Sequence, residues 1–178
     1  MSRPAAKVFG IVGWHNSGKT TLIVQLIARF VGLGLAVSTM KHGHHEFDID
    51  QPGKDSHRHR AAGATEVLIS SARRWALMHE NRAEPEADMT ALVQRMTPVD
   101  LLLVEGFKRD RHAKLEVHRP ALGQPILCPG DPTIVAVASD VRLPGLAVPV
   151  LDLNDVPAIA RFILTQVGIA ARVPDATA

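Results

Sequence analysis

Hydrophobic residues along this chain gather into short runs separated by polar, glycine-rich segments. Nearly continuous apolar runs predict buried strands, and apolar residues repeated every three or four positions predict helices. Runs of the first kind occur at residues 7–13, 35–41, 99–106, 112–119, 133–140 and 148–153. Helical spacing covers residues 20–34 and 155–170, with Asp155 as the expected N-cap of the second helix. Strands that alternate with helices predict an α/β fold, with a mostly parallel sheet covered on both faces.

A different pattern occupies the middle of the chain. Residues 65–70 and 74–80 alternate between apolar and polar positions, which predicts an antiparallel hairpin inserted at about residues 65–80. One short helix is expected with Asp55 as its cap, and another at 84–96 with acidic residues in its first turn.

Composition favours one soluble, cytoplasmic domain. The 178 residues are 46% hydrophobic, enough for one substantial core, so we expect a single domain over residues 1–170 and a C-terminal tail at 171–178. The single cysteine, Cys128, excludes an internal disulfide. A formal charge of +2 and the absence of tyrosine do not favour nucleic-acid binding, and no apolar run is long enough for a membrane span.

The strongest chemical signal is "GWHNSGKT", Gly13 to Thr20, which fits G-x-x-x-x-G-K-[ST] between a predicted strand and a predicted helix. Glycines let successive backbone N–H groups point at a phosphate chain, and the helix dipole favours the anion further. Lys19 then places its charge at the β- and γ-phosphates, and the Thr20 hydroxyl coordinates Mg²⁺. The segment predicts a phosphate-binding loop.

Ligands of α/β proteins bind at the carboxyl ends of parallel strands, which here are Gly13, Lys41, Glu105 and Asp140. Glu105 is the expected second acidic anchor of Mg²⁺; the alternative is an ion pair with a following basic residue. Asp140 has the chemistry to accept hydrogen bonds from guanine, but a plain strand-terminal turn fits it equally well, since no Asn-Lys-x-Asp string occurs.

Residues 41–60, "KHGHHEFDIDQPGKDSHRHR", are rich in histidine, aspartate and basic side chains. Three interpretations remain open: a zinc site built on the histidines, a solvated loop, or a segment that responds to the γ-phosphate and Mg²⁺. We favour the third, in which Asp48 and Asp50 hold a metal-bound water or orient an attacking one.

With these residues in view, the chain resembles the molybdopterin-guanine dinucleotide biosynthesis protein B (MobB) family. The likeness is carried by "GWHNSGKTTL", "KHGHHEFDIDQPGKDSHRHRAAGA", "LLLVEGFK", "KLEVHR" and "AVASD". It implies a three-layer P-loop NTPase fold and a GTP-binding adaptor with weak Mg²⁺-dependent GTPase activity. It further implies molybdopterin or its guanine dinucleotide as a ligand, the MobA nucleotidyltransferase as a partner, and a homodimer formed with help from the hairpin.

The resemblance also implies a set of site residues. Lys19 and Asp50 are the expected catalytic residues, and Thr20, Glu105 and Asp50 the expected metal ligands. Nucleotide contacts are expected from Gly13, His15, Asn16, Ser17, Gly18, Lys19, Thr20, Thr21, Ser139 and Asp140.

Two other functional classes remain open from the residues. An ATP-dependent small-molecule kinase would use residues 41–60 to bind its phosphate acceptor, with an aspartate taking the proton. A metal or molybdate chaperone would store its cargo on the histidines.

Overall fold

The structure is a computed structural model and describes residues 6–43 and 47–170. The chain forms two compact units, one built from residues up to 42 and from 96 onward, and the other from residues 43–95. The tail expected at 171–178 lies outside the described residues.

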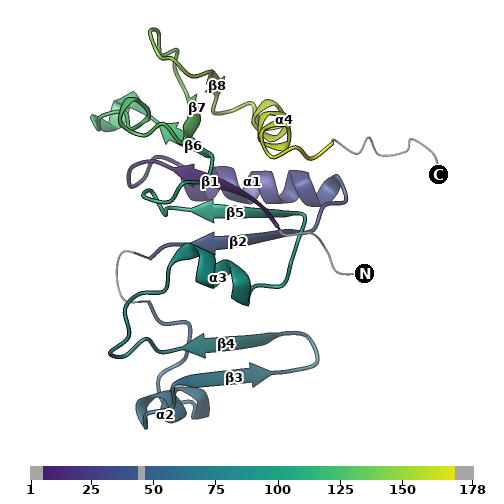
Figure 1. The fold of residues 1–178 in the computed structure, drawn as a ribbon, viewed down its shortest axis with the longest axis vertical. Helices are drawn as coiled ribbons and strands as arrows, with labels where there is room; N and C mark the ends of the chain where they lie inside the picture. Colours follow the sequence, from purple (N-terminus) through teal and green to yellow (C-terminus); the bar gives the residue numbers. More distant parts are fainter. Residues whose placement is uncertain (1–5, 44–46, 171–178) are drawn as a thin grey trace, which may run out of the picture. The chain divides into compact units, whose positions relative to one another are not determined.

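The first unit is built on a six-stranded sheet in which every neighbouring pair of strands is parallel (Figure 1). The strand order is β2-β5-β1-β6-β7-β8. The strands span Lys7–Val12 (β1), Val37–Lys41 (β2), Leu101–Glu105 (β5), Lys114–His118 (β6), Ile134–Ser139 (β7) and Val150–Asp152 (β8). The α/β fold class, with a mostly parallel sheet and a separate hairpin, is confirmed.

Strand β2 differs from the expectation. The sequence predicts a buried strand at residues 35–41, but β2 lies at the edge of the sheet and its residues are partly buried or exposed. The four fully apolar residues Leu101–Val104 of β5 lie between β2 and β1, because β5 pairs with both of them. A local apolar run fixes neither the order of strands nor which strand is an edge.

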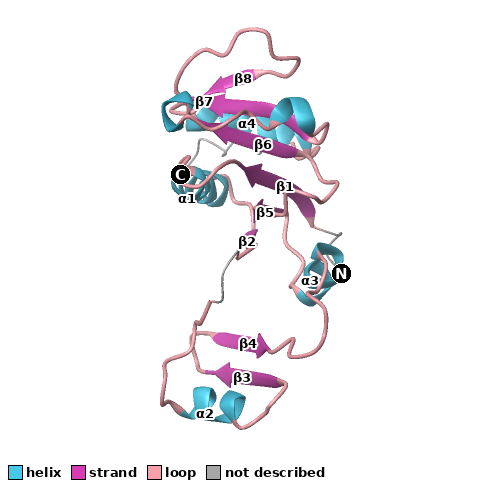
Figure 2. Cartoon of the chain, turned by 90° about the vertical axis from the view of Figure 1, so that its left-hand side faces the viewer, coloured by secondary structure: helices cyan, strands magenta, loops and turns pink. Residues whose placement is uncertain are grey.

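Two helices, α1 (Lys19–Gly32) and α4 (Val156–Gln166), pack in one cluster against the sheet (Figure 2). Alternate strand residues face this cluster, among them Phe9 and Ile11 of β1, which are fully buried against Leu26 and Phe30 of α1. The predicted cap is present, since Asp155 Oδ1 accepts a hydrogen bond from the Ala158 N–H. No helix in the described ranges is both long and apolar enough to cross a bilayer.

A second cluster, formed by β1, β7 and loop residues, covers part of the sheet without an α-helix. The loop after β6 carries two short 3₁₀ helices, η1 (Pro120–Leu122) and η2 (Cys128–Gly130). Glu116 of β6 fixes this loop: its carboxylate is fully buried and accepts hydrogen bonds from the N–H groups of Leu127 and Cys128, both at 2.8 Å. A buried carboxylate with two backbone donors holds its surroundings in one geometry.

The second unit contains the expected hairpin, with β3 (Glu66–Ser70) antiparallel to β4 (Trp75–His79). Its two helices differ in detail from the expectation. Asp55 is the first residue of α2 (Asp55–Ala61), and Lys54 is the N-cap. The other helix of this unit, α3 (Met89–Arg95), begins later than the expected residue 84. Asp88 caps it, since the Asp88 carboxylate accepts a hydrogen bond from the Ala91 N–H at 2.7 Å. The acidic residues therefore precede α3 and do not lie in its first turn.

Candidate functional site

The G-x-x-x-x-G-K-T segment forms a tight loop between β1 and α1. Asn16 (φ 60°) and Gly18 (φ 101°) adopt left-handed backbone conformations, which curl the chain over the start of the helix. Gly18 is the N-cap of α1 and no side chain caps the helix, so its first N–H groups are not taken up by a capping side chain. At Gly13 a side chain would not fit, because a Cβ atom would lie 2.4 Å from the carbonyl oxygen of Val117 in β6. This loop has the geometry that binds phosphate.

Lys19 lies at the centre of an excess of positive charge. Its Nζ donates a hydrogen bond to the Trp14 carbonyl oxygen at 2.7 Å. Burial lowers the pKa of Lys19 below 10.5; Glu105 opposes this shift, and the charges of Lys108 and Lys41 add to it. An anion in the loop would stabilise the charged form of this partly buried lysine and offset the repulsion from Lys108 and Lys41.

Two of the three predicted magnesium ligands, Thr20 and Glu105, lie together. Thr20 Oγ1 lies 3.2 and 3.3 Å from the two carboxylate oxygens of Glu105, whose side chain is only 13% exposed. Oxygens at neighbouring corners of a Mg²⁺ octahedron lie about 3 Å apart when the bonds are about 2.1 Å long, so this pair fits the ion. Lys41 Nζ is 3.4 Å from Glu105 Oε1. A divalent cation at Glu105 would replace that ion pair.

One pocket joins these groups. It has a volume of about 330 Å³ and is lined by His15, Asn16, Gly18, Lys19, Thr20, Thr21, Lys41 and Glu105. The carboxyl ends of three strands, β1, β2 and β5, therefore meet around it, as expected from their parallel arrangement. Ser17 is buried beneath the loop, 1% exposed, and does not line the pocket.

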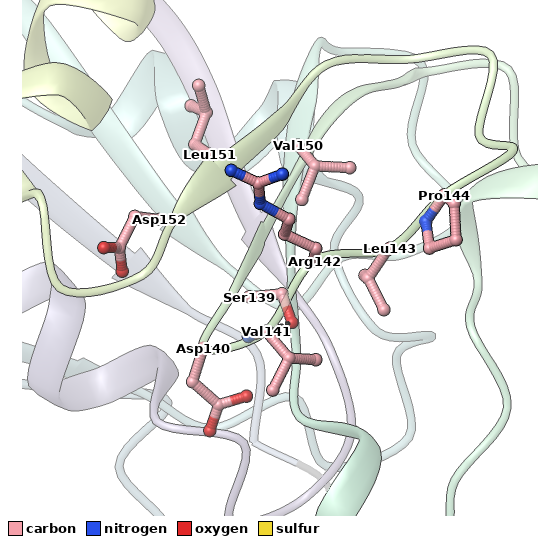
Figure 3. Close-up of a pocket in the computed structure, with 9 residues that line it drawn as sticks. All are labelled: Ser139, Asp140, Val141, Arg142, Leu143, Pro144, Val150, Leu151 and Asp152. Atoms are coloured by element: carbon pink, nitrogen blue, oxygen red, sulfur yellow. Dashed lines mark hydrogen bonds between the residues drawn. The ribbon is translucent and has the colours of Figure 1, made fainter.

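The expected base contacts lie further along the same edge. Ser139, the last residue of β7, and Asp140, which follows it, line an open pocket of about 530 Å³ together with residues 141–144 and 150–152 (Figure 3). The Ser139 hydroxyl accepts a hydrogen bond from the Val141 N–H, which is the turn geometry that the sequence left open as an alternative. Figure 3 shows the Asp140 carboxylate directed away from the Arg142 guanidinium. A pocket of this size can hold a purine.

Two basic residues that the sequence analysis did not single out as site residues lie beside the P-loop. Lys108 Nζ is 4.8 Å from the centre of the Trp14 ring. Arg119 Nε donates to the Ser17 carbonyl oxygen at 3.1 Å. Both residues follow the carboxyl end of a strand, β5 or β6, and that position was the available signal. At the end of β5, Glu105 was the expected site residue and a following basic residue was only its alternative ion-pair partner; the end of β6 was not among the strand ends expected to converge.

Asp50 belongs to the second unit. Its carboxylate is 5% exposed, accepts a hydrogen bond from the Ser56 hydroxyl at 2.6 Å and lies 3.7 Å from Arg60 Nε. Arg60 also pairs with Asp48 and Glu80, at 2.8 and 3.0 Å, and its hydrogen bond lowers the pKa of Asp48. Within this unit Asp50 is part of a network that orders the segment, and its roles toward metal and water stay predictions.

The histidines proposed for a zinc site are only partly described. His44 and His45 lie outside the described residues. Over residues 6–43 and 47–170, no group of three histidine, cysteine, aspartate or glutamate side chains is placed to hold a metal ion. Thr20 and Glu105 are a different kind of site, since Mg²⁺ completes its coordination with phosphate oxygens and water.

A parallel α/β sheet, with a Gly-Lys-Thr loop between its first strand and helix and an acidic residue ending the neighbouring strand, defines a P-loop protein. Residues 8–140 match the family model of molybdopterin guanine dinucleotide synthesis protein B, and the chain belongs to this MobB family.

Individual relatives support this assignment to the MobB family. The chain is 42% identical over 160 residues to the molybdopterin-guanine dinucleotide biosynthesis adapter protein of Escherichia coli K12, covering 88% of this chain and 91% of that protein. It is 38% identical over 156 residues to the adapter protein of Haemophilus influenzae, covering 88% and 86%. The crystal structure of Bacillus subtilis MobB superposes with a TM-score of 0.72 at 25% identity, covering 90% of this chain and 97% of that one.

Proposed function

We propose that this protein is a GTP-binding adaptor in the biosynthesis of molybdopterin guanine dinucleotide, with weak Mg²⁺-dependent GTPase activity. The observation that carries the proposal is the single pocket at which Lys19, Thr20 and Glu105 converge. The two relatives described above are adapter proteins of molybdopterin-guanine dinucleotide biosynthesis, which supports the pathway.

In this proposal, different residues of the pocket bind different parts of the nucleotide. The P-loop N–H groups and Lys19 bind the phosphates, while Thr20 and Glu105 hold Mg²⁺, which neutralises charge on the β- and γ-phosphates. Of the described residues that line this pocket, only Glu105 is a carboxylate, and we assign it to the metal. No second carboxylate among these lining residues is left to orient an attacking water, which agrees with slow hydrolysis.

The test is a set of melting curves with GTP, ATP and molybdopterin, with and without Mg²⁺. A ligand that binds only the folded state raises its melting temperature by mass action, so we expect a GTP-selective shift that Mg²⁺ increases. Addition of the chain to MobA is expected to raise the yield of guanine dinucleotide. An equal shift with ATP, together with phosphorylated molybdopterin, would favour the kinase, and a stoichiometric transition metal in the purified protein would favour the chaperone.

We further propose that the chain is a homodimer in which the hairpin contributes to the interface. One face of β3–β4 carries three exposed apolar side chains: Leu68 (61% exposed), Trp75 (63%) and Leu77 (45%). The opposite face is covered at one end only, where Val67 and Met78 are buried, while Ile69 on the same face is 44% exposed. A two-stranded sheet with an open apolar face gains stability when a second surface covers it.

Leu77→Glu tests this interface, because a charge on the exposed face opposes burial of its neighbours. We expect light scattering to give the mass of two chains for the wild type and a shift toward one chain for the variant. Leu122→Glu, at an apolar residue of the first unit that is 39% exposed, is the control and should leave the mass unchanged. A wild-type protein with the mass of one chain contradicts the dimer.

A further inference from the structure

Arg119 connects two parts of the candidate site that are far apart in sequence. Its Nε donates to the carbonyl oxygen of Ser17 in the P-loop, and its Nη1 donates to Asp140 Oδ2 at 2.7 Å. Arg119 also lies beside Gly18, where a Cβ atom would be 3.6 Å from the guanidinium Nε. One planar group thus touches both the phosphate loop and the carboxylate expected to contact the base.

The sheet holds Arg119 at this place. Strand β6 lies between β1, which leads into the P-loop, and β7, which ends at Asp140. Arg119 is the first residue after β6, so its side chain starts between the two. The strand before it is fixed by fully buried Glu116, and the Arg119 side chain is itself only 37% exposed. A guanidinium held at both ends in this way has little freedom to turn elsewhere.

The pairing changes what Asp140 can do. A bare carboxylate next to a triphosphate site would repel the ligand, whereas a carboxylate neutralised by Arg119 does not. With Oδ2 held by Arg119, the orientation of the carboxylate is set and Oδ1 remains as an acceptor. Guanine offers N–H donors at N1 and at its exocyclic amine, while adenine offers no donor at N1.

A smaller pocket, of about 180 Å³, lies beside Arg119. It is lined by Gly18, Thr21, Leu22, Gln25, Arg119, Leu153 and Asn154. It shares Gly18 and Thr21 with the pocket at the P-loop. A nucleotide whose phosphates lie on the P-loop would pass Arg119 on the way to Asp140.

We propose that Arg119 is a positioning residue that couples recognition of the base at Asp140 to binding of the phosphates at the P-loop. The inference rests on the proposed function, because it takes a guanine nucleotide as the ligand. Arg119 holds the carboxylate in the orientation that accepts from the base, and it holds the P-loop backbone through Ser17. Selectivity for guanine then depends on the two-ended contact and not on positive charge alone.

The experiment compares the affinities of GTP, ATP and inorganic tripolyphosphate, each with Mg²⁺, by calorimetry. Arg119→Lys keeps the charge but not the fork of donors, and Arg119→Ala removes both. We expect both variants to lower the ratio of GTP to ATP affinity about tenfold, and to lower tripolyphosphate affinity less. Asp140→Ala should lower the ratio to the same degree, and the double variant Arg119→Ala/Asp140→Ala should lower it no further, because the two residues act as one unit.

Arg161→Ala, on the exposed side of α4, is the control and should keep the wild-type ratio. Melting curves identify any variant that fails to fold. If Arg119→Ala fails to fold, the test is made with Arg119→Lys, which is the milder exchange. A wild-type preference for GTP that both Arg119 variants retain overturns this inference alone. A wild type that binds GTP and ATP equally overturns the guanine preference in the proposed function, and this inference with it.

Discussion

Replacement of Lys19 by alanine is expected to lower the affinity for GTP by about 3 kcal/mol, on the order of a hundredfold in Kd. Lys19 is the first residue of α1, which places it next to the P-loop N–H groups. Its Nζ lies within hydrogen-bond distance of the Trp14 carbonyl oxygen. Phosphate oxygens that replace this carbonyl would gain a charge-assisted bond, which alanine cannot provide. Calorimetric titration with Mg²⁺ and GTP measures the loss.

Lys7→Ala provides the matched control for that experiment. Lys7 begins β1 and is exposed, and its backbone N–H, not its side chain, donates a hydrogen bond to the Asp100 carbonyl oxygen. The same exchange there removes one lysine charge and leaves the pocket intact, so GTP affinity should stay within about twofold. Unchanged GTP affinity in Lys19→Ala would refute the P-loop as the nucleotide site.

Glu105→Gln is expected to separate nucleotide binding from its dependence on Mg²⁺. Glutamine keeps the size of the side chain and can still bond Thr20, but it carries no charge for the cation. We expect the factor by which Mg²⁺ raises GTP affinity to be about tenfold smaller in this variant than in the wild type. GTP affinity without Mg²⁺ should stay the same or rise, because a negative charge near the phosphates is gone. Hydrolysis should fall together with the Mg²⁺ effect.

These opposite changes are measured by titrating GTP with and without Mg²⁺, and by following phosphate release. Glu84→Gln makes the same exchange at an exposed carboxylate of the second unit and should change neither quantity. A Glu105→Gln protein that retains the full Mg²⁺ effect would mean that the cation is held elsewhere.

The sequence was sufficient for the elements that surround the pocket. The strand, loop and helix at residues 7–34 follow from a buried run, glycines and helical spacing, all of which are local signals. Convergence of Lys41 and Glu105 on the P-loop followed from the rule for parallel strands, and the paired register of these two residues agrees.

Strand order and side-chain pairing were beyond the sequence. The edge position of β2 and the place of β6 beside β1 depend on contacts between distant segments, which no local pattern records. Arg119 was missed for this reason, since its relation to Ser17 and Asp140 exists only once β6 lies between β1 and β7. The start of α3 was misjudged because Asp88 was read as a first-turn residue and acts as the cap.

The close contact between Gly13 and Val117 has a consequence for the size of ligand that the site accepts. Val117 of β6 lies two residues before Arg119, so the P-loop and the proposed base contact at Asp140 both adjoin the same strand, whose hydrogen bonds to β1 and β7 fix their separation. A molecule engages both ends only if the span from its base to its first phosphates matches that distance. In the proposed function, free guanine or free polyphosphate would fill one end alone, and groups added beyond the last phosphate would leave the match unchanged.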